Sequence, residues 1–256
     1  MNILFTICGR AGSKGFKNKN LKELNGVPLV YYTLAVIKLY IEKHFDDKVI
    51  VALNTDSNPL VDLVKYQNIL EDIQIIPRKG KLAGDRVAKV GVVKDTYLNV
   101  CATSKIDVVV DLDLTSPFRD VFDIENCIAE YQSNIDYDLV VSVVHARRSP
   151  YFNMVEKKGS FYHKICDSNY TTRQEAPAVY ELNASIYAYR PVFLESEITN
   201  NILDNRCGVY VMDDYLVLDI DSEEDFRMME FLLTYYSKQD TGLAEVYKLA
   251  RQFVTD

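Results

Sequence analysis

The sequence predicts an α/β fold built around a mostly parallel sheet. From Asn2 to Val144, short apolar runs of strand length alternate with longer apolar-rich segments of helical length. Such alternation is typical of right-handed βαβ units, and strands that are apolar on both faces indicate helices on both sides of the sheet. Ligands bind such sheets beyond the carboxyl ends of the strands, so a functional site is expected in the loops found there.

The expected elements follow one another along the chain. The strands are short, apolar and often β-branched, and are expected at Asn2–Cys8, Lys48–Asn54, Ile73–Pro77, Asp107–Leu112, Asp138–Val144 and Tyr215–Ile220. The helices are longer and are expected at Pro28–Lys43, Ser57–Gln67, Val87–Cys101, Asp120–Gln132, Glu223–Ser237 and Thr241–Phe253. Pro28 suits a first helical turn, and the Ser57 hydroxyl suits a helix cap.

The pattern changes between Arg147 and Tyr189. This segment is rich in tyrosine, polar residues and turn formers, and its periodicity is weak. We expect an irregular or antiparallel insertion that serves as a flap or a dimerisation arm. The chain would then consist of an α/β domain (residues 1–146 and 191–256) and an inserted arm (residues 147–190).

Composition excludes several classes of protein. A chain of 256 residues with 48% hydrophobic residues can bury a substantial core, and its net charge of −8 argues against a general nucleic-acid or membrane-surface binder. Its five cysteines are scattered without a C-x-x-C pair, so they indicate neither a disulfide framework nor a zinc site. No apolar stretch approaches the roughly 20 residues that span a bilayer, and no signal peptide is evident. We expect a soluble, cytoplasmic protein.

A basic, glycine-containing loop follows the first strand. It contains three glycines, Gly9, Gly12 and Gly15. It also contains four cations, which are Arg10, Lys14, Lys17 and Lys19. Glycines let backbone N–H groups approach an anion closely, and four cations in an acidic chain indicate a highly charged anion such as a nucleoside triphosphate. The spacing is neither that of a P-loop nor that of a dinucleotide-binding loop. The alternative is a flexible basic surface turn.

An acidic pair, Asp219 and Asp221, stands near the end of the chain. In an extended segment residues i and i+2 point to the same side, so both carboxylates face together. Magnesium prefers one or two carboxylates together with waters and substrate phosphates, which such a pair offers. The alternative is helix capping by Asp221 or Ser222, with Asp225 completing a capping box.

These motifs together resemble those of the acylneuraminate (sialic acid) cytidylyltransferases, the CMP-sugar synthetases for nine-carbon keto-acid sugars. The Arg-x-Gly-Ser-Lys-Gly loop of residues 10–15 and the Lys-Asn-Leu of residues 19–21 match their signature, and further segments follow in family order. The resemblance implies a three-layer, Rossmann-like nucleotidyltransferase fold of the GT-A-like type with an inserted dimerisation and substrate arm.

For the nucleotide, the resemblance implies a set of contacts with CTP. Phosphate contacts would come from Arg10, Ser13 and Lys19, with Lys14 offsetting charge on the leaving phosphates. The pocket itself would be formed by Gly12, Asn20, Arg78 and Ala83. The match around Arg78 is partial because Lys79 replaces a proline of the family, and a solvated basic turn is the alternative. Arg10, Lys19, Asp219 and Asp221 would be the catalytic residues.

The segment Asp113–Arg119 resembles the family's Gln-Pro-Thr-Ser-Pro-Leu-Arg. The residues that match are Thr115, Ser116, Pro117 and Arg119. Asp113 stands where glutamine is common, and Leu114 where proline is. The related synthetases for the eight-carbon sugar Kdo carry an aspartate here that helps hold metal. Asp113 would therefore join the metal site or contact the sugar directly. The alternative is a carboxylate that orients the turn through backbone N–H groups.

Two later segments resemble the family's R-Q-x-x-P and N-G-A-I-Y motifs. They imply that Arg173 binds the sugar carboxylate, since a bidentate arginine suits an α-keto acid, and that Gln174, Asn183 and Tyr187 contact its polar groups. The alternative for the tyrosines is packing at a dimer interface.

The resemblance thus implies a Mg²⁺-dependent cytidylyltransferase that joins CTP to a nonulosonic acid, of the sialic or legionaminic type, in a cytoplasmic homodimer. One alternative is a nucleotidyltransferase acting on a sugar 1-phosphate, which would leave Arg173 without a carboxylate. Another is a nucleotide-sensing module without turnover, which would not need the aspartate pair.

Overall fold

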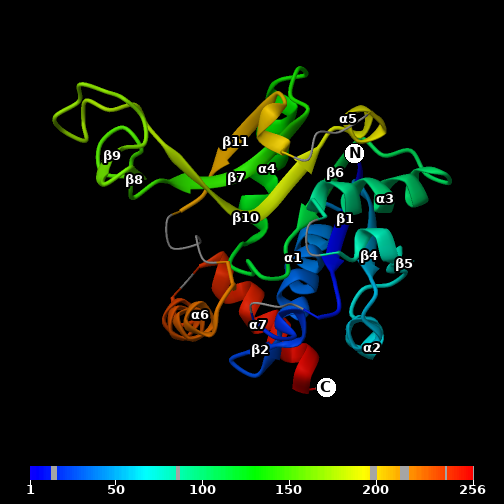
Figure 1. Ribbon diagram of the computed structural model, residues 1–256. Helices are drawn as coiled ribbons and strands as arrows, with labels where there is room; N and C mark the ends of the chain where they lie inside the picture. Colours follow the sequence, from blue (N-terminus) through cyan, green and yellow to red (C-terminus); the bar gives the residue numbers. More distant parts are fainter. Residues whose placement is uncertain (13–15, 85–86, 197–200, 214–218, 240, 256) are drawn as a thin grey trace.

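The computed structural model describes residues 1–12, 16–84, 87–196, 201–213, 219–239 and 241–255 (Figure 1). Within these residues the centre is a seven-stranded sheet in the order β11-β7-β10-β6-β1-β4-β5. Its strands are β1 (Asn2–Gly9), β4 (Lys48–Thr55), β5 (Gln74–Pro77), β6 (Val108–Leu112), β7 (Leu139–His145), β10 (Tyr180–Tyr189) and β11 (Cys207–Val211). Strand β10 is antiparallel to both neighbours, and the other pairs are parallel. The predicted α/β class with a mostly parallel sheet is confirmed.

Helices cover both faces of this sheet (Figure 1). They are α1 (Leu29–Lys43), α2 (Asn58–Lys65), α3 (Lys89–Cys101), α4 (Val121–Ser133), α5 (Pro191–Glu195), α6 (Glu223–Tyr236) and α7 (Gly242–Thr255). Along β1 the side chains of Ile3, Phe5 and Ile7 pack into one core, with α1, α4 and α7, while Leu4 packs into a second core with α3 and α5. This alternation is the period-two pattern of a strand buried on both faces, and it gives the predicted three layers.

Helix α1 is buried on most of its surface, since ten of its 15 residues are buried. It lies between the sheet and α7, and the rings of Tyr31 and Phe253 meet edge to face with centroids 6.0 Å apart. Each fully buried large apolar side chain contributes about 1.5–3 kcal/mol to the free energy of folding. The N-terminal βα unit is therefore a rigid support for the loop that follows β1.

The six predicted helices and the first five predicted strands are present, with ends within a few residues of those expected. Ser57 caps α2 as predicted, because its hydroxyl accepts a hydrogen bond from the Leu60 amide. The predicted strand at Tyr215–Ile220 lies outside the described residues except for Asp219 and Ile220, which form neither helix nor strand. Edge strand β11 was not predicted.

Smaller elements connect these parts. They are β2 (Glu23–Leu24), β3 (Val27–Pro28), η1 (Lys19–Leu21), η2 (Tyr66–Asn68), η3 (Gly80–Leu82) and η4 (Ile202–Asp204). None of the helices in the described ranges is long and apolar enough to cross a membrane.

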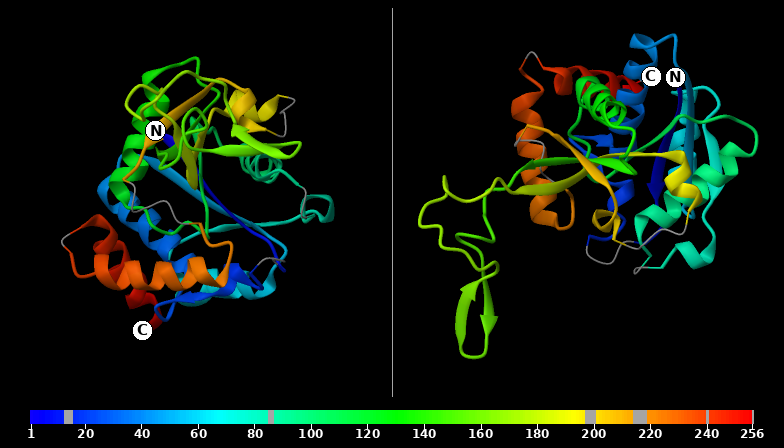
Figure 2. Two further views of the ribbon diagram at one scale, coloured as in Figure 1. Left: turned by 60° about the vertical axis from the view of Figure 1, so that its left-hand side comes forward. Right: turned by 90° about the horizontal axis from the view of Figure 1, so that it is seen from above.

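The segment after β7 projects from the body of the molecule (Figure 2). It contains an antiparallel hairpin of β8 (Val155–Lys158) and β9 (Phe161–Lys164), and Gly159 takes a positive φ of 64° in its turn. The chain then returns as β10, which lies in the central sheet between β6 and β7. The ladder between β10 and β7 shifts register between Leu182 and Tyr187, where Ala184 has a φ of 55°.

Candidate active site

A cavity of about 240 Å³ lies at the carboxyl ends of the parallel strands. Loops after β1, β5 and β6 and the segment before α6 all contribute to it. Seven of the predicted site residues line it: Arg10, Lys19, Asn20, Arg78, Asp113, Thr115 and Asp219. The remaining lining residues are Cys8, Leu82, Gly84, Val87, Lys89 and Val92. Side chains more than 200 positions apart in the sequence therefore meet at one edge of the sheet.

Lys19 connects the basic loop to the acidic pair. Its ammonium donates to the Ile220 carbonyl oxygen at 2.8 Å and lies 3.0 Å from Asp221 Oδ1. The Asp221 side chain is 78% exposed, so the ion pair is open to solvent and can be exchanged for a phosphate. Asn20, the next residue, donates from its amide to the Arg10 carbonyl oxygen at 3.1 Å and so holds the loop closed.

The cap of α6 is distinct from the acidic pair. Ser222 and Asp225 form a reciprocal capping box, with the Ser222 hydroxyl accepting from the Asp225 amide at 3.2 Å. Asp225 Oδ2 also accepts from the Asp221 amide, at 3.2 Å. The capping alternative therefore applies to Ser222, and the carboxylates of Asp219 and Asp221 are not used as the cap.

Asp219 has a buried oxygen, Oδ1, without a hydrogen-bond partner. Burial raises the pKa of this carboxyl, and the neighbouring Asp113 carboxylate raises it further. A buried polar atom left unpaired is costly, so a native structure that keeps one usually supplies a ligand or an ion to it. Asp219 Oδ1 is an oxygen suited to a hard cation.

Asp113 is held by two neighbours. Its Oδ1 accepts from the backbone amide and the hydroxyl of Thr115, each at 3.0 Å, and its Oδ2 accepts from the Lys89 ammonium at 2.6 Å. Burial alone would raise the pKa of Asp113, but Lys89 and the Thr115 hydrogen bonds lower it to about 2. The Asp113 carboxylate thus orients the turn through the Thr115 amide, as the alternative interpretation expected. Its lowered pKa also keeps it ionised.

Lys89 and Asp111 belong to the site and escaped sequence reasoning. Lys89 is the first residue of α3, and its ammonium lies 2.6 Å from Asp111 Oδ2 as well as from Asp113 Oδ2. A lysine at the positive end of a helix dipole, and an aspartate inside an apolar strand, are each unfavourable on their own. These two unfavourable placements are the features of the sequence that could have pointed to Lys89 and Asp111 as site residues.

Arg78 is fixed at the end of the sheet. Its guanidinium donates to the Asn54 side-chain oxygen at 3.1 Å and to the Asn54 carbonyl oxygen at 2.9 Å. Ala83 lies between two lining residues without lining the cavity itself, and Gly12 is exposed with a φ of 67°. Ser13 and Lys14 lie outside the described residues.

Ser116 and Asn183 are buried and do not line the cavity. The Ser116 hydroxyl donates to the Asn183 carbonyl oxygen at 3.0 Å, and the Ser142 hydroxyl donates to Asn183 Oδ1 at 2.6 Å. Both side chains support the sheet end where β10 is irregular. Tyr187 places its ring 5.0 Å from the Lys89 ammonium, and burial raises the pKa of this phenol to about 12.

Arg119 matches the family motif in the sequence but was given no role in the site there. Its side chain is fully buried and donates to the carbonyl oxygens of Asp113 at 2.7 Å, Ser116 at 2.8 Å and Ser185 at 2.9 Å. It also donates to the Thr33 hydroxyl at 2.8 Å. Arg119 therefore ties the loop after β6 to β10 and to α1.

Arg173 and Gln174 lie on the exposed arm, apart from this cavity. Arg173 donates to the carbonyl oxygens of Ala146 and Arg147. It lines a separate hollow of about 260 Å³ with His145 and Arg148. A single chain thus does not bring Arg173 and Gln174 to Asp219.

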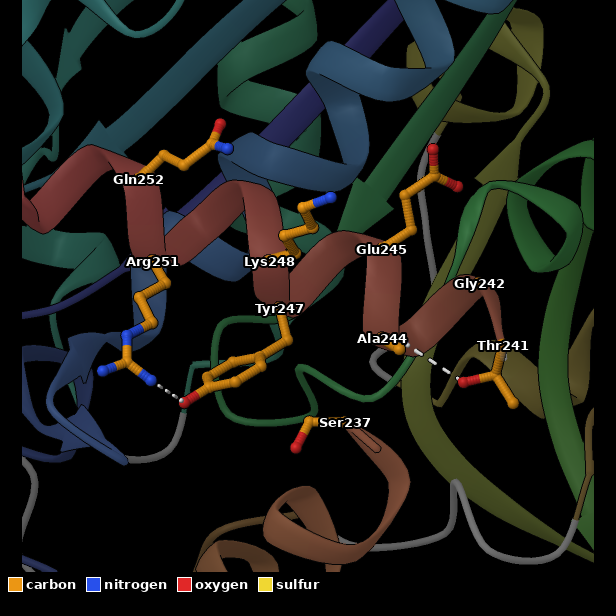
Figure 3. Close-up of a pocket in the computed structure, with 9 residues that line it drawn as sticks. All are labelled: Ser237, Thr241, Gly242, Ala244, Glu245, Tyr247, Lys248, Arg251 and Gln252. Atoms are coloured by element: carbon orange, nitrogen blue, oxygen red, sulfur yellow. Dashed lines mark hydrogen bonds between the residues drawn. The ribbon is translucent and has the colours of Figure 1, made fainter. Parts of the chain in front are cut away.

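A larger hollow of about 950 Å³ follows one side of α7 (Figure 3). It is lined by Ser237, Thr241, Gly242, Ala244, Glu245, Tyr247, Lys248, Arg251 and Gln252. None of the predicted residues lies there, and Arg251 donates to the neighbouring Tyr247 hydroxyl at 3.4 Å within the same helix. The smaller cavity, where the cations and carboxylates meet, is the better candidate for chemistry.

Across the described residues, no three or more histidine, cysteine, aspartate and glutamate side chains gather closely enough to hold a metal ion by themselves. A cation at this cavity would therefore complete its coordination with water or with oxygens of a bound substrate, in addition to carboxylates. Mg²⁺ bound to nucleotide phosphates has this requirement.

Comparison with known proteins gives a consistent picture. The family model described as "Cytidylyltransferase" matches residues 4–251. The chain is 34% identical over 235 residues to the post-translational flagellin modification protein B of Campylobacter coli, covering 90% of this chain and 94% of that protein. It is 37% identical over 236 residues to the CMP-N,N'-diacetyllegionaminic acid synthase of Campylobacter jejuni, covering 91% and 95%. An N-acylneuraminate cytidylyltransferase of Escherichia coli is 28% identical, and its match covers 96% of this chain and 55% of that protein.

Solved structures show the same fold at low sequence identity. A CMP-2-keto-3-deoxy-manno-octonic acid synthetase, solved as a complex with CTP, matches with a TM-score of 0.60 at 15% identity, covering 92% of this chain and 99% of that one. A 4-diphosphocytidyl-2C-methyl-D-erythritol synthase from Anaerococcus prevotii matches with a TM-score of 0.58 at 13% identity, covering 91% and 99%. The chain belongs to the cytidylyltransferase family.

Proposed function

We propose that the protein transfers CMP from CTP to a nonulosonic acid of the sialic or legionaminic type, giving a CMP-sugar and pyrophosphate. The observation that carries this proposal is the meeting of Arg10 and Lys19 with Asp219 in one cavity of a cytidylyltransferase fold. The relatives named as a legionaminic acid synthase and as N-acylneuraminate cytidylyltransferases support the class of acceptor.

In the proposed reaction the anomeric hydroxyl of the sugar attacks the α-phosphorus of CTP. An O–P bond forms, the bond between the α-phosphorus and the bridging oxygen breaks, and pyrophosphate leaves with the electron pair while the hydroxyl proton is released. Arg10, Lys14 and Lys19 would offset the charge on the leaving phosphates, and such transfers depend chiefly on positioning and charge stabilisation. Gly12, Ser13, Asn20, Arg78 and Ala83 would form the nucleotide side of the site.

We further propose that Asp219 and Asp221 hold the Mg²⁺ ion. The buried, unpartnered Asp219 Oδ1 fits a cation ligand, and the exposed Asp221 carboxylate becomes available when Lys19 turns to a phosphate. When bound, Mg²⁺ would supply positive charge to the phosphate oxygens. In this proposal Lys19 exchanges one anionic partner, Asp221, for another.

The sugar would lie on the side of Asp113 and Thr115, with Ser116, Asn183 and Tyr187 shaping the floor. Because Arg173 and Gln174 lie on the arm, we propose that they reach the cavity of a second copy in a homodimer. The arm carries exposed apolar side chains, among them Phe161 at 73% and Tyr162 at 67% exposure, which a second copy would cover. We also propose that the protein works in the cytoplasm, where it would use CTP.

The test is pyrophosphate release from each of the four nucleoside triphosphates against a panel of nonulosonic acids and sugar 1-phosphates, with and without Mg²⁺. We expect release only with CTP, a nonulosonic acid and the divalent cation together. Release that does not require any keto-acid sugar, or that prefers a sugar 1-phosphate, would overturn the proposal.

A further inference from the structure

Lys89 occupies an unusual position for a cation in a site for anionic substrates. Its ammonium forms a hydrogen-bonded ion pair with Asp113 Oδ2 at 2.6 Å. It also lies 2.6 Å from Asp111 Oδ2. This contact is an ion pair and not a hydrogen bond, since Asp111 Oδ2 has no hydrogen-bond partner. The Tyr187 ring, 5.0 Å away, closes another side of the ammonium through a cation–π contact. Two carboxylates and a ring thus surround this cation.

The position of Lys89 is fixed by buried elements. Asp111 is fully buried in β6, and its other oxygen accepts from the Thr6 hydroxyl of β1 at 2.6 Å. Lys89 begins α3, and its side chain is 30% exposed where it lines the cavity. The ammonium is therefore held by Asp111 of the sheet on one side, and the Lys89 side chain lines the cavity on the other. It is part of the site rather than a solvated surface charge.

The two carboxylates that line the cavity, Asp113 and Asp219, differ in whether an oxygen is still without a hydrogen-bond partner. Both oxygens of Asp113 already accept hydrogen bonds, one from Lys89 and the other from Thr115. Asp219 in contrast keeps a buried oxygen without any partner. A divalent cation that bound Asp113 would have to sit close to the Lys89 ammonium or displace it, and both are electrostatically costly. A cation that bound Asp219 would find an oxygen, Oδ1, that no ammonium already occupies.

We propose that Lys89 is a positioning residue that takes the place of a metal ion on Asp113. It withholds Asp113 from the divalent cation and fixes this carboxylate as a hydrogen-bond acceptor for a hydroxyl of the acceptor sugar. The metal part of this inference stands on the ion pairs alone, whereas the sugar part rests on the proposed function. It replaces the sequence-based expectation that Asp113 is a metal ligand.

The first experiment asks directly whether Asp113 binds metal. Mn²⁺ is titrated into the nucleotide-free protein and followed by electron paramagnetic resonance, in the wild type, Asp113→Asn and Asp219→Asn. We expect Asp113→Asn to bind Mn²⁺ within twofold of the wild type and Asp219→Asn to bind it at least tenfold more weakly. A tenfold loss in Asp113→Asn would overturn the proposal.

The second experiment removes the ammonium. Lys89→Met leaves Asp111 and Asp113 uncompensated, so we expect it to bind Mn²⁺ at least tenfold more tightly or at one additional site. The double variant Lys89→Met/Asp111→Asn keeps the net charge of the three side chains at −1, because one cation and one anion are removed together. It should bind Mn²⁺ more tightly as well, since Asp113 is released in both variants.

Lys79→Met is the matched control, because Lys79 pairs with Asp95 close to the site without touching a carboxylate that lines the cavity. It should bind Mn²⁺ as the wild type does. Unchanged Mn²⁺ binding in the double variant would overturn the proposal, even if Lys89→Met alone failed to fold. These readouts use the metal alone, so they do not depend on which acceptor the enzyme uses.

The sugar part is read from kinetics. If the proposed function holds, Asp113→Asn should raise KM for the nonulosonic acid at least tenfold and leave KM for CTP within twofold. An equal rise in both constants, or an increase in the Mg²⁺ requirement, would show that Asp113 acts on the nucleotide side and would overturn this role. Absence of nonulosonic acid turnover in the wild type would instead count against the proposed function and leave the Mn²⁺ results standing.

Discussion

Lys19 Nζ lies 3.0 Å from Asp221 Oδ1, across 202 positions of the sequence. This contact joins the loop after β1, whose Lys19 lines the candidate active site, to the segment before α6. It also gives Lys19 an anionic partner when no nucleotide is bound. The ion pair is exposed at Asp221, so its contribution to stability is small, about 0–1 kcal/mol.

Lys19→Met should therefore affect catalysis far more than folding. We expect kcat/KM for CTP to fall at least 100-fold while the melting temperature changes by less than about 2 °C. The matched control is Lys22→Met, whose ammonium lies over the Phe16 ring, 4.7 Å from its centroid, rather than in the cavity. Equal losses of activity in both variants would show that the loop needs general positive charge rather than Lys19.

Asp221 and Ser222 are adjacent, but the structure separates their roles. Asp221→Asn should nearly abolish turnover and leave stability unchanged, because Asp221 does not cap α6. Ser222→Ala removes the capping hydroxyl and should cost about 1 kcal/mol of unfolding free energy with turnover largely kept. Urea unfolding and steady-state kinetics on both variants check the separation. Loss of stability in Asp221→Asn with normal turnover would return the aspartate to a capping role.

Arg119→Met should be strongly destabilising. It removes the guanidinium from a buried network. The Ser116 and Ser185 carbonyl oxygens keep a second donor each, whereas the Asp113 carbonyl oxygen loses its Arg119 donor, at roughly 1–3 kcal/mol for a group that stays unpaired. We expect a loss of at least about 3 kcal/mol by urea unfolding, and turnover reduced even at temperatures where the variant is folded, because the loop carrying Asp113 and Thr115 loses its anchor. Arg227→Met is the control, since Arg227 makes an exposed i,i+4 pair with Glu223 worth a few tenths of a kcal/mol. Comparable losses in the two variants would contradict the anchoring role.

Asp123 should make stability depend on pH. Burial, and then the Asp120 carboxylate, raise the pKa of the Asp123 carboxyl from 3.8 to about 7. Between these two values the unfolded chain has lost the proton that the folded chain keeps, so this group lowers the free energy of unfolding as the pH rises through that window.

Asp123→Asn removes that dependence and can still accept from the Asp120 amide. The variant should therefore gain stability relative to the wild type as the pH rises from 4 to 7, by at most about 1.4 kcal/mol per pH unit. Urea unfolding at a series of pH values measures this difference. Parallel curves for the two proteins would contradict the assignment.

The helices and strands that the sequence predicted correctly are those determined by patterns of residues close together in the chain. Apolar runs such as Ile3–Ile7 identified buried strands, and Ser57 identified a cap, because each depends on residues close in sequence. The loop after β1 and the acidic pair stood out because their charges and spacing are unusual for a fold element. Seven of the predicted site residues do line one cavity.

What sequence reasoning missed depends on distant partners. Arg119 matches the family motif, but nothing near it in the sequence shows that its side chain is buried and bonded to β10 and α1. The role of Lys89 was likewise hidden in the sequence, because its partners Asp111 and Asp113 lie on β6 and on the loop that follows it. The antiparallel insertion of β10 between β6 and β7 is likewise a long-range pairing that no local periodicity encodes.

The central claim, transfer of CMP to a keto-acid sugar, is tested most directly by ³¹P NMR of a complete reaction with CTP, Mg²⁺ and a nonulosonic acid. We predict one new phosphodiester resonance from the CMP-sugar, together with pyrophosphate in equal amount. A pair of coupled resonances from a diphosphate-linked sugar, formed only when a sugar 1-phosphate is supplied, would contradict it.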